Sequence, residues 1–231
     1  MVRHDGSVKK LVIAIDGPSG AGKGTLARTV AERLGYRHVD TGAMYRAVAW
    51  KAAHEGLPLN DDAVVAALAR RAVYQQANGV ITIDGHDVTR AIRTPEIDMA
   101  ATSVARLPHV REVLVAQQRD LGSGGAVVME GRDIGTVVFP DADLKLYLDA
   151  SAEERARRRA GDVAHTGGQQ GSLANVQSEL VARDQSDSTR PVAPLSMAPD
   201  AIYIDTTTMP VDVVVNRVMM LVAEKLEASS Q

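Results

Sequence analysis

The sequence of 231 residues contains no cysteine. This absence excludes disulfides, thiol catalysis and cysteine metal sites, and it agrees with a cytoplasmic location. No apolar run approaches the roughly 20 residues of a membrane span, and residues 1–10 lack the hydrophobic segment of a signal peptide. The formal net charge of −3 provides no global basic field for nucleic acid. We therefore expect a cytoplasmic protein that binds neither membrane nor nucleic acid.

A glycine-rich stretch follows the first apolar run of the chain, residues 11–15, and precedes a predicted helix. Its glycines allow backbone angles that a side chain would forbid, so that successive N–H groups can turn inward around an anion. Lys23 can reach β- and γ-phosphates, and the Thr25 hydroxyl can face Mg²⁺, directly or through water. The alternative is a turn without a ligand. The predicted phosphate-binding residues are Gly17, Pro18, Ser19, Gly20, Ala21, Gly22, Lys23, Gly24 and Thr25.

Strand and helix patterns alternate along most of the chain. Apolar runs near residues 11, 36, 126, 144 and 201 predict five strands. The alternation predicts an α/β fold, with a parallel sheet that is covered by helices on both faces. A length of 231 residues fits one domain with insertions or two small domains.

The segment over residues 60–95 departs from this alternation of strands and helices. Asn78-Gly79 and Asp84-Gly85 separate short β-branched runs, which predicts an inserted antiparallel β subdomain. A helix over residues 61–71, capped by Asn60, precedes these runs. Thr94 is placed to cap the helix that follows, with proline at its first position.

Charged side chains interrupt the apolar stripe of the helix predicted over residues 173–186. The stripe begins at Leu173 and continues, at the same helical spacing, onto Arg183, Asp187 and Arg190. A break in the polar–apolar pattern is expected chiefly at functional sites. The alternative is that the helix ends near Arg183 and that a solvated ion pair follows.

Two further pairs of charged residues stand near predicted loops. Arg155 and Arg159 lie one helical turn apart, before a Gly- and Gln-rich segment over residues 161–172 that predicts a mobile loop. Paired guanidiniums suit an anion that gains charge in a transition state, although an exposed basic helix face is the alternative. Arg132 and Asp133 follow a strand, at the sheet edge where α/β proteins bind ligands, although a structural ion pair is the alternative.

Together these motifs resemble the bacterial cytidylate kinases, which are nucleoside monophosphate kinases. The resemblance covers residues 10–227, and it rests on the glycine-rich stretch, on residues 40–46 and 131–142, and on the run 183–195. It implies a P-loop kinase fold with the strand order 2-3-1-4-5. The implied single domain has a core at residues 10–59, 96–154 and 173–227, an inserted nucleotide-binding subdomain at 60–95 and a helical lid at 155–172.

The resemblance also implies an activity: transfer of the γ-phosphoryl group of ATP to CMP or dCMP, with Mg²⁺, by a monomer. Residues 17–25 would bind the ATP phosphates. Arg183 and Arg190 would bind the CMP phosphate and Asp187 the ribose, while Lys23, Arg155 and Arg159 would be catalytic. The full implied CMP site comprises Thr41, Arg46, Thr102, Arg111, Arg132, Asp133, Arg183, Asp187 and Arg190.

Two positions depart from some relatives, and two other functions stay open. Thr102 stands where other members have serine, and Glu130 stands where aspartate can occur, which leaves the part of Glu130 in organising Mg²⁺ open. The alternatives are a P-loop kinase for another small acceptor, such as another nucleotide, and a non-catalytic nucleotide-binding regulatory module.

Overall fold

The computed structural model describes residues 10–77, 79–162 and 172–228. The chain divides into two compact units. The first unit comprises Met1–Asp40, Arg119–Ser151 and Leu195–Gln231, and the second comprises Thr41–Gln118 and Ala152–Pro194. Each unit therefore assembles its core from stretches that lie far apart in the sequence.

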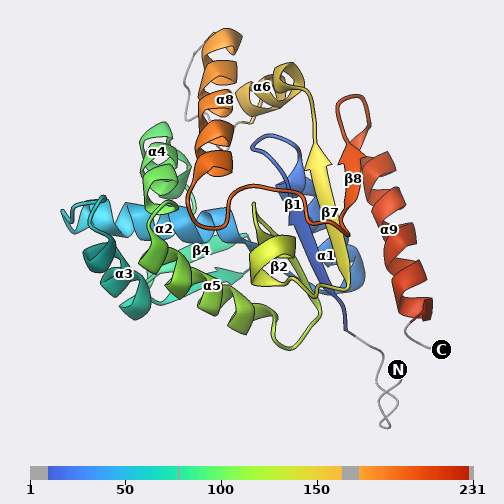
Figure 1. Cartoon of the computed structure of the whole chain (residues 1–231), viewed down its shortest axis with the longest axis horizontal. Helices are drawn as coiled ribbons and strands as arrows, with labels where there is room; N and C mark the ends of the chain where they lie inside the picture. Colours follow the sequence, from blue (N-terminus) through green and yellow to red (C-terminus); the bar gives the residue numbers. More distant parts are fainter. Residues whose placement is uncertain (1–9, 78, 163–171, 229–231) are drawn as a thin grey trace. The chain divides into compact units, whose positions relative to one another are not determined.

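The first unit is built on a five-stranded parallel sheet with the order β2-β6-β1-β7-β8 (Figure 1). Ile15 of the central strand β1 lies opposite Glu130 on one side and Leu146 on the other. Numbered along the chain, this order is 2-3-1-4-5, so the predicted topology is confirmed. The strands are β1 (Val12–Asp16), β2 (Arg37–Asp40), β6 (Val127–Glu130), β7 (Leu144–Asp149) and β8 (Ile202–Asp205).

The core of the first unit lies between this sheet and two helices, α1 (Lys23–Leu34) and α9 (Val211–Ala228). Ile13 of β1, Val30 of α1 and Val218 of α9 belong to one buried cluster. The central strands are continuous apolar runs because both faces of a parallel sheet are covered. Gly35 ends α1 with φ 64°, a left-handed conformation that glycine adopts without strain.

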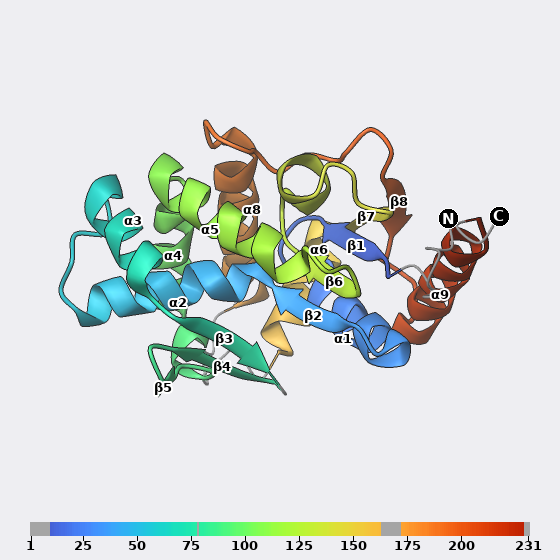
Figure 2. The same cartoon turned by 90° about the horizontal axis from the view of Figure 1, so that it is seen from below.

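The second unit combines helices with a three-stranded antiparallel sheet of order β3-β4-β5. Figure 2 shows this sheet beside α2, and its middle strand β4 packs on that helix. The sheet confirms the predicted antiparallel insertion. Its strands are β3 (Tyr74–Ala77), β4 (Val80–Ile83) and β5 (His86–Asp87), and the helices are α2 (Thr41–His54), α3 (Asp62–Arg71), α4 (Pro95–Val104), α5 (Pro108–Gly122, in this unit up to Gln118), α6 (Ala152–Ala160) and α8 (Leu173–Thr189).

Two details of the helices differ from the prediction, and a third confirms it. Asp61, not Asn60, caps α3, because its carboxylate accepts the backbone N–H of Val64 at 3.1 Å. Leu173 is 44% exposed, so that burial along α8 begins only in its later turns. Thr94 caps α4 as predicted, by accepting the backbone N–H of Ile97. In the part of the chain that the structure describes, no helix is long and apolar enough to span a membrane.

Candidate nucleotide-binding site

The glycine-rich stretch connects β1 to α1 within the first unit. Gly17 has φ 142°, and a Cβ added there would lie 2.0 Å from the carbonyl oxygen of Leu148, so the close approach to β7 requires glycine. The loop delivers Lys23 to the first position of α1, where its Nζ donates a hydrogen bond to the Pro18 carbonyl at 2.7 Å. A helix N-terminus, a glycine-rich turn and a buried ammonium together form a phosphate-binding arrangement.

The carboxylate of Glu130 lies beside this loop. A Cβ added at Gly24 would lie 3.2 Å from Oε1 of Glu130, so the carboxylate sits against the residue that precedes the exposed Thr25. The same carboxylate contacts Nε2 of His38 at 3.0 Å. Among the described residues, no group of three or more His, Cys, Asp and Glu side chains could hold a metal ion. One hydroxyl and one nearby carboxylate fit Mg²⁺, which binds few protein ligands and otherwise water and substrate phosphates.

Asp16 is a buried carboxylate at the end of β1 that the sequence reasoning did not single out. It accepts the backbone N–H groups of Ile134 at 2.8 Å and Gly135 at 2.7 Å. Burial is the main reason that its pKa rises to about 6, with the charge of Asp133 adding to it, while the two N–H groups and Lys23 act in the opposite direction. Asp16 thereby connects the start of a π-helical turn, Ile134–Val138, to β1, the strand that precedes the glycine loop.

Two predicted site residues, Arg132 and Asp133, lie directly before that turn in the first unit. Asp133 is 5% exposed, and its carbonyl oxygen accepts the backbone N–H groups of Val137 and Val138. Arg132 is half-buried and donates from Nη1 to the Gly131 carbonyl at 3.2 Å. Both therefore lie at the carboxyl end of β6, the edge where the sequence predicted them.

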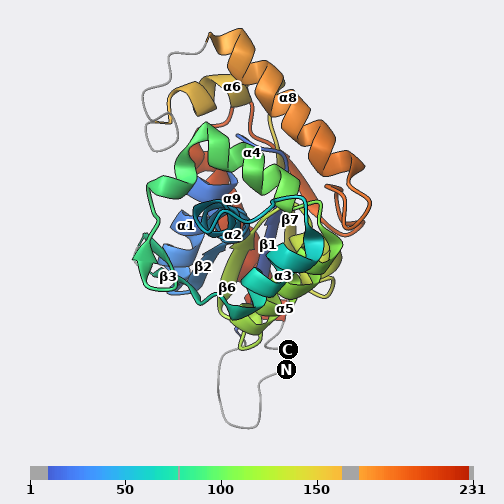
Figure 3. The same cartoon turned by 90° about the vertical axis from the view of Figure 1, so that its left-hand side faces the viewer.

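The second unit contains an ion-pair cluster on three helices, α4, α6 and α8, which lie together in Figure 3. Asp98 of α4 forms ion pairs with Arg159 of α6 and with Arg183 of α8. Arg155 of α6 pairs with Asp184 of α8. The structure thus brings three predicted arginines together, and it adds two carboxylates that the sequence reasoning missed.

Thr102 is joined to this cluster through the backbone of α4. Its Oγ1 donates to the carbonyl oxygen of Asp98 at 2.9 Å, one helical turn earlier.

Arg111, on α5, is 2% exposed, and its guanidinium lies 5.5 Å from the ring centroid of Tyr45. Its Nη1 donates to the Ala105 carbonyl at 3.3 Å. A buried guanidinium that stacks on a ring and bonds a carbonyl is held in one orientation.

The other predicted residues of the second unit are buried as well. Thr41 and Arg46 lie on α2, Asp187 lies on α8, and Arg190 follows that helix at its C-cap. Arg190 also donates from Nε to the Ala193 carbonyl. Charged groups are buried in proteins when they are paired or when they bind a charged ligand, so this concentration of arginine indicates an anion site.

The sequence is similar to those of known proteins along nearly its whole length. The family model described as Cytidylate kinase matches residues 13–224. A cytidylate kinase of Solibacter usitatus is 46% identical over 226 residues, which are 96% of each chain. A cytidylate kinase of Desulfitobacterium hafniense is 48% identical over 222 residues, which are 95% of each chain. The chain belongs to the cytidylate kinase family.

A solved structure supports the fold assignment for this cytidylate kinase family member. The shikimate kinase of Bacteroides thetaiotaomicron is 12% identical and has a TM-score of 0.50, with 93% of this chain and 99% of that chain covered. At this identity the likeness concerns the fold alone. The α/β fold of a P-loop kinase is therefore confirmed, with a separate antiparallel sheet of its own.

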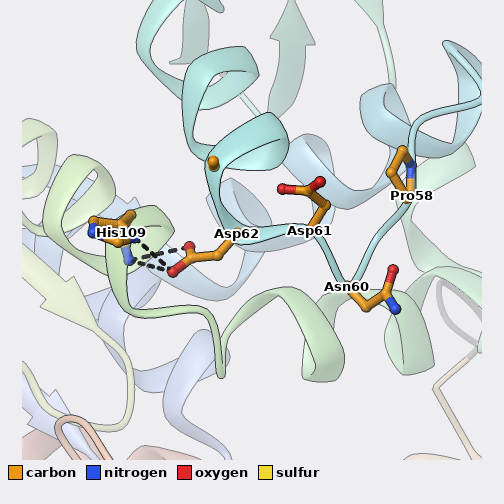
Figure 4. Close-up of a pocket in the computed structure, with 6 residues that line it drawn as sticks. Pro58, Asn60, Asp61, Asp62 and His109 are labelled. Atoms are coloured by element: carbon orange, nitrogen blue, oxygen red, sulfur yellow. Dashed lines mark hydrogen bonds and ion pairs between the residues drawn. The ribbon is translucent and has the colours of Figure 1, made fainter.

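A pocket in the second unit is lined by none of the predicted site residues of this family member (Figure 4). Asp62 accepts the backbone N–H groups of His109 at 3.1 Å and Val110 at 3.2 Å, and it contacts Nδ1 of His109 at 2.8 Å. Burial raises the pKa of Asp62, but these hydrogen bonds outweigh burial and hold the pKa below its ordinary value. The contacts cap the start of α5 and account for these polar groups. The lining residues are Pro58, Asn60, Asp61, Asp62, Ala63 and His109.

Proposed function

We propose that the chain transfers the γ-phosphoryl group of ATP to CMP, with dCMP as a second acceptor. Family membership supports this reaction. The observation that carries it is the presence, in one chain, of a phosphate-binding loop with Lys23 and of a separate arginine cluster around Asp98. A kinase whose acceptor is itself a phosphate needs cationic groups for both substrates, whereas a simple alcohol acceptor does not.

The donor side of the proposal uses residues 17–25. Their backbone N–H groups and Lys23 would bind the ATP phosphates, and Thr25 would hold Mg²⁺, directly or through water, with Glu130 nearby. When bound with ATP, Mg²⁺ would neutralise charge on the β- and γ-phosphate oxygens. Lys23 is suited to the same task because its ammonium is buried at the start of α1 and turned toward the loop.

The acceptor side of the proposal assigns Arg183 and Arg190 to the CMP phosphate and Asp187 to the ribose. A set of polar side chains would form hydrogen bonds with the cytosine base. When a different base binds, some of these buried polar groups would have no hydrogen-bond partner, and this would disfavour that base. Two further residues, Thr41 and Arg46, would contact the acceptor nucleotide. The proposed base-contacting residues are Thr102, Arg111, Arg132 and Asp133.

The chemistry of the proposed reaction requires no covalent enzyme intermediate. An oxygen of the CMP phosphate attacks the γ-phosphorus in line, the bond from the γ-phosphorus to the β–γ bridging oxygen breaks, and ADP leaves with the electron pair. No general base is needed, because the attacking phosphate is already an anion. Lys23, Arg155 and Arg159 would stabilise the charge on the transferring group.

The proposed division of the chain keeps one kinase domain, with its core at residues 10–59, 96–154 and 173–227 and a nucleotide-binding subdomain at 60–95. The proposed lid covers residues 155–172, of which 163–171 lie outside the described residues. That the chain works as a cytoplasmic monomer stays a prediction, and sedimentation equilibrium checks the monomer.

A coupled assay of ADP release tests the proposed function. With MgATP and the full chain, release should require CMP or dCMP and should be slow with no acceptor. A preference for UMP or another phosphorylated acceptor would favour the P-loop kinase of different specificity. Nucleotide binding without turnover for any acceptor would instead favour the regulatory module and would contradict the proposal.

A further inference from the structure

We propose that Asp98 is a positioning residue for phosphoryl transfer: its carboxylate is an internal counterion that holds Arg159 and Arg183 until phosphate groups of the substrates displace it. The inference rests on the proposed function, because it concerns two of the arginines that would bind phosphate groups. Asp98 itself would touch neither the nucleotide nor the reacting atoms. It acts through the arginines.

The geometry joins one carboxylate to guanidiniums on two different helices. Oδ1 of Asp98 lies 3.3 Å from Nη1 of Arg183, and Oδ2 pairs with Nη2 of Arg159. The three side chains are 13%, 18% and 22% exposed, in the order Asp98, Arg183, Arg159. They are therefore largely shielded from water, and their mutual charges act more strongly than a surface pair would.

The two guanidiniums contact the same carboxylate, and this contact is what a phosphate would replace. Nη1 of Arg183 and Nη2 of Arg159 lie against the two oxygens of Asp98. A phosphate, with more charge and more oxygen acceptors than a carboxylate, can take over both guanidiniums and satisfy them better.

The helix α4 gives Asp98 a fixed position for this task. Asp98 lies in the first turns of α4, whose N-terminus is capped by Thr94, and its carbonyl accepts the Thr102 hydroxyl at 2.9 Å. Thr102 is a proposed base contact. A carboxylate one helical turn from a proposed base contact would hold the two arginines near the acceptor before it binds, and this lowers the ordering cost at binding.

The variant Asp98→Asn separates the two effects of the carboxylate. It removes the competing negative charge, so the Kd for CMP, measured by calorimetry without ATP, should fall about tenfold. It also removes the group that orients Arg159, so kcat should fall about tenfold. A lower kcat together with a lower Kd is not what a general loss of packing gives, because such damage weakens binding. An unchanged or higher Kd would overturn the proposal.

Two further variants sharpen the result. Glu96→Gln is the matched control, because Glu96 lies on the same helix, is exposed, and loses the same charge; its Kd and kcat should stay within about twofold of the wild type. Asp98→Glu keeps the charge but lengthens the side chain, so CMP affinity should stay near that of the wild type while kcat falls. An unchanged kcat in Asp98→Glu would overturn the positioning role, even if Asp98→Asn failed to fold.

Failure of the proposed function would be visible separately. If the wild type released no ADP with any nucleotide acceptor, the reaction would be wrong, and the counterion would be tested with inorganic phosphate alone. Asp98→Asn should then bind inorganic phosphate more tightly than the wild type and Glu96→Gln, and the gain should shrink at high salt. Equal phosphate affinity in all three proteins would contradict the counterion role of Asp98 as well.

Discussion

The two units of the molecule hold their functional charges in different ways. In the first unit, Lys23 donates to a backbone carbonyl and Asp16 accepts two backbone N–H groups. In the second unit, Arg155 and Arg159 pair with carboxylates on neighbouring helices. Backbone dipoles thus contact the charges of the first set, and carboxylates contact those of the second.

This difference has a physical consequence for the reaction. A charged side chain that is held by backbone dipoles can interact with a ligand without losing a charged partner. An arginine that is paired with a carboxylate must instead break that ion pair before all of its N–H groups can bind a phosphate. We therefore expect the glycine loop to be ready for ATP and the arginine cluster to rearrange. Salt should weaken the contacts of the second unit more than those of the first.

The largest effect is expected for the removal of Lys23, the charged residue of the glycine loop. Lys23→Ala should lower kcat by about 10²–10³, because one preformed electrostatic contact to a transition state is worth that much. The fold should survive, since the backbone of the loop stays. Steady-state kinetics with MgATP and CMP measure the loss, and Lys225→Ala, an exposed lysine of α9, is the control. A Lys23→Ala enzyme within a few-fold of the wild type would remove Lys23 from the proposed mechanism.

The second effect concerns the buried carboxylate of the same unit. Burial raises the pKa of Asp16 from an ordinary 3.8 to about 6, so the folded protein binds this proton more tightly than the unfolded chain does. The contribution to stability is present below pH 3.8 and is lost as the pH rises through about 6, which amounts to about 3 kcal/mol.

Asp16→Asn measures this contribution. The difference in unfolding free energy between wild type and Asp16→Asn should decrease by about 2.4 kcal/mol from pH 4 to pH 7, because only the wild type must ionise a buried carboxylate. Urea unfolding across this range provides the values. Asp120→Asn, at an exposed position, should show no such trend. A difference that stayed constant with pH would mean that Asp16 titrates normally.

The third effect tests an arginine of the second unit. Arg183→Ala should raise the KM for CMP about 10- to 150-fold, because a hydrogen bond to a charged group contributes about 1.5–3 kcal/mol. The KM for ATP should change little, and the melting temperature should change little because Asp98 keeps Arg159 as a partner. A large drop in melting temperature with an unchanged KM for CMP would instead identify a structural ion network.

The smallest effect tests an ion pair that we place outside the site. Asp62→Ala removes the acceptor for the first N–H groups of α5 and should cost about 0.5–2 kcal/mol of unfolding free energy, as a lost helix cap does. Kinetic constants should not change. Asn60→Ala, at a neighbouring residue that caps no helix, is the control and should cost less than about 0.5 kcal/mol. A changed KM for CMP in Asp62→Ala would place this pocket in the reaction.

The same contrast explains what the sequence could reveal. The glycine loop is contiguous and follows an apolar strand, so its residues could be predicted from local pattern alone. The strand order came from the family resemblance. Asp98 and Asp184 could not be predicted, because their partners lie 61 and 29 residues away and nothing local marks a carboxylate that pairs across helices. Asp16 was missed for a similar reason, since its contacts are 118 and 119 residues distant.

The ion pairs that join α4, α6 and α8 have a use in protein engineering. Arg155 with Asp184, and Asp98 with both Arg159 and Arg183, fasten the two helices on either side of residues 163–171. The helices on both sides of this stretch are thus held together by contacts that do not involve it. Extra chain length between two elements that are already joined adds closure entropy only slowly, by about 0.6 kcal/mol for each doubling. A peptide tag or a fluorescent reporter inserted there should leave the helices in place.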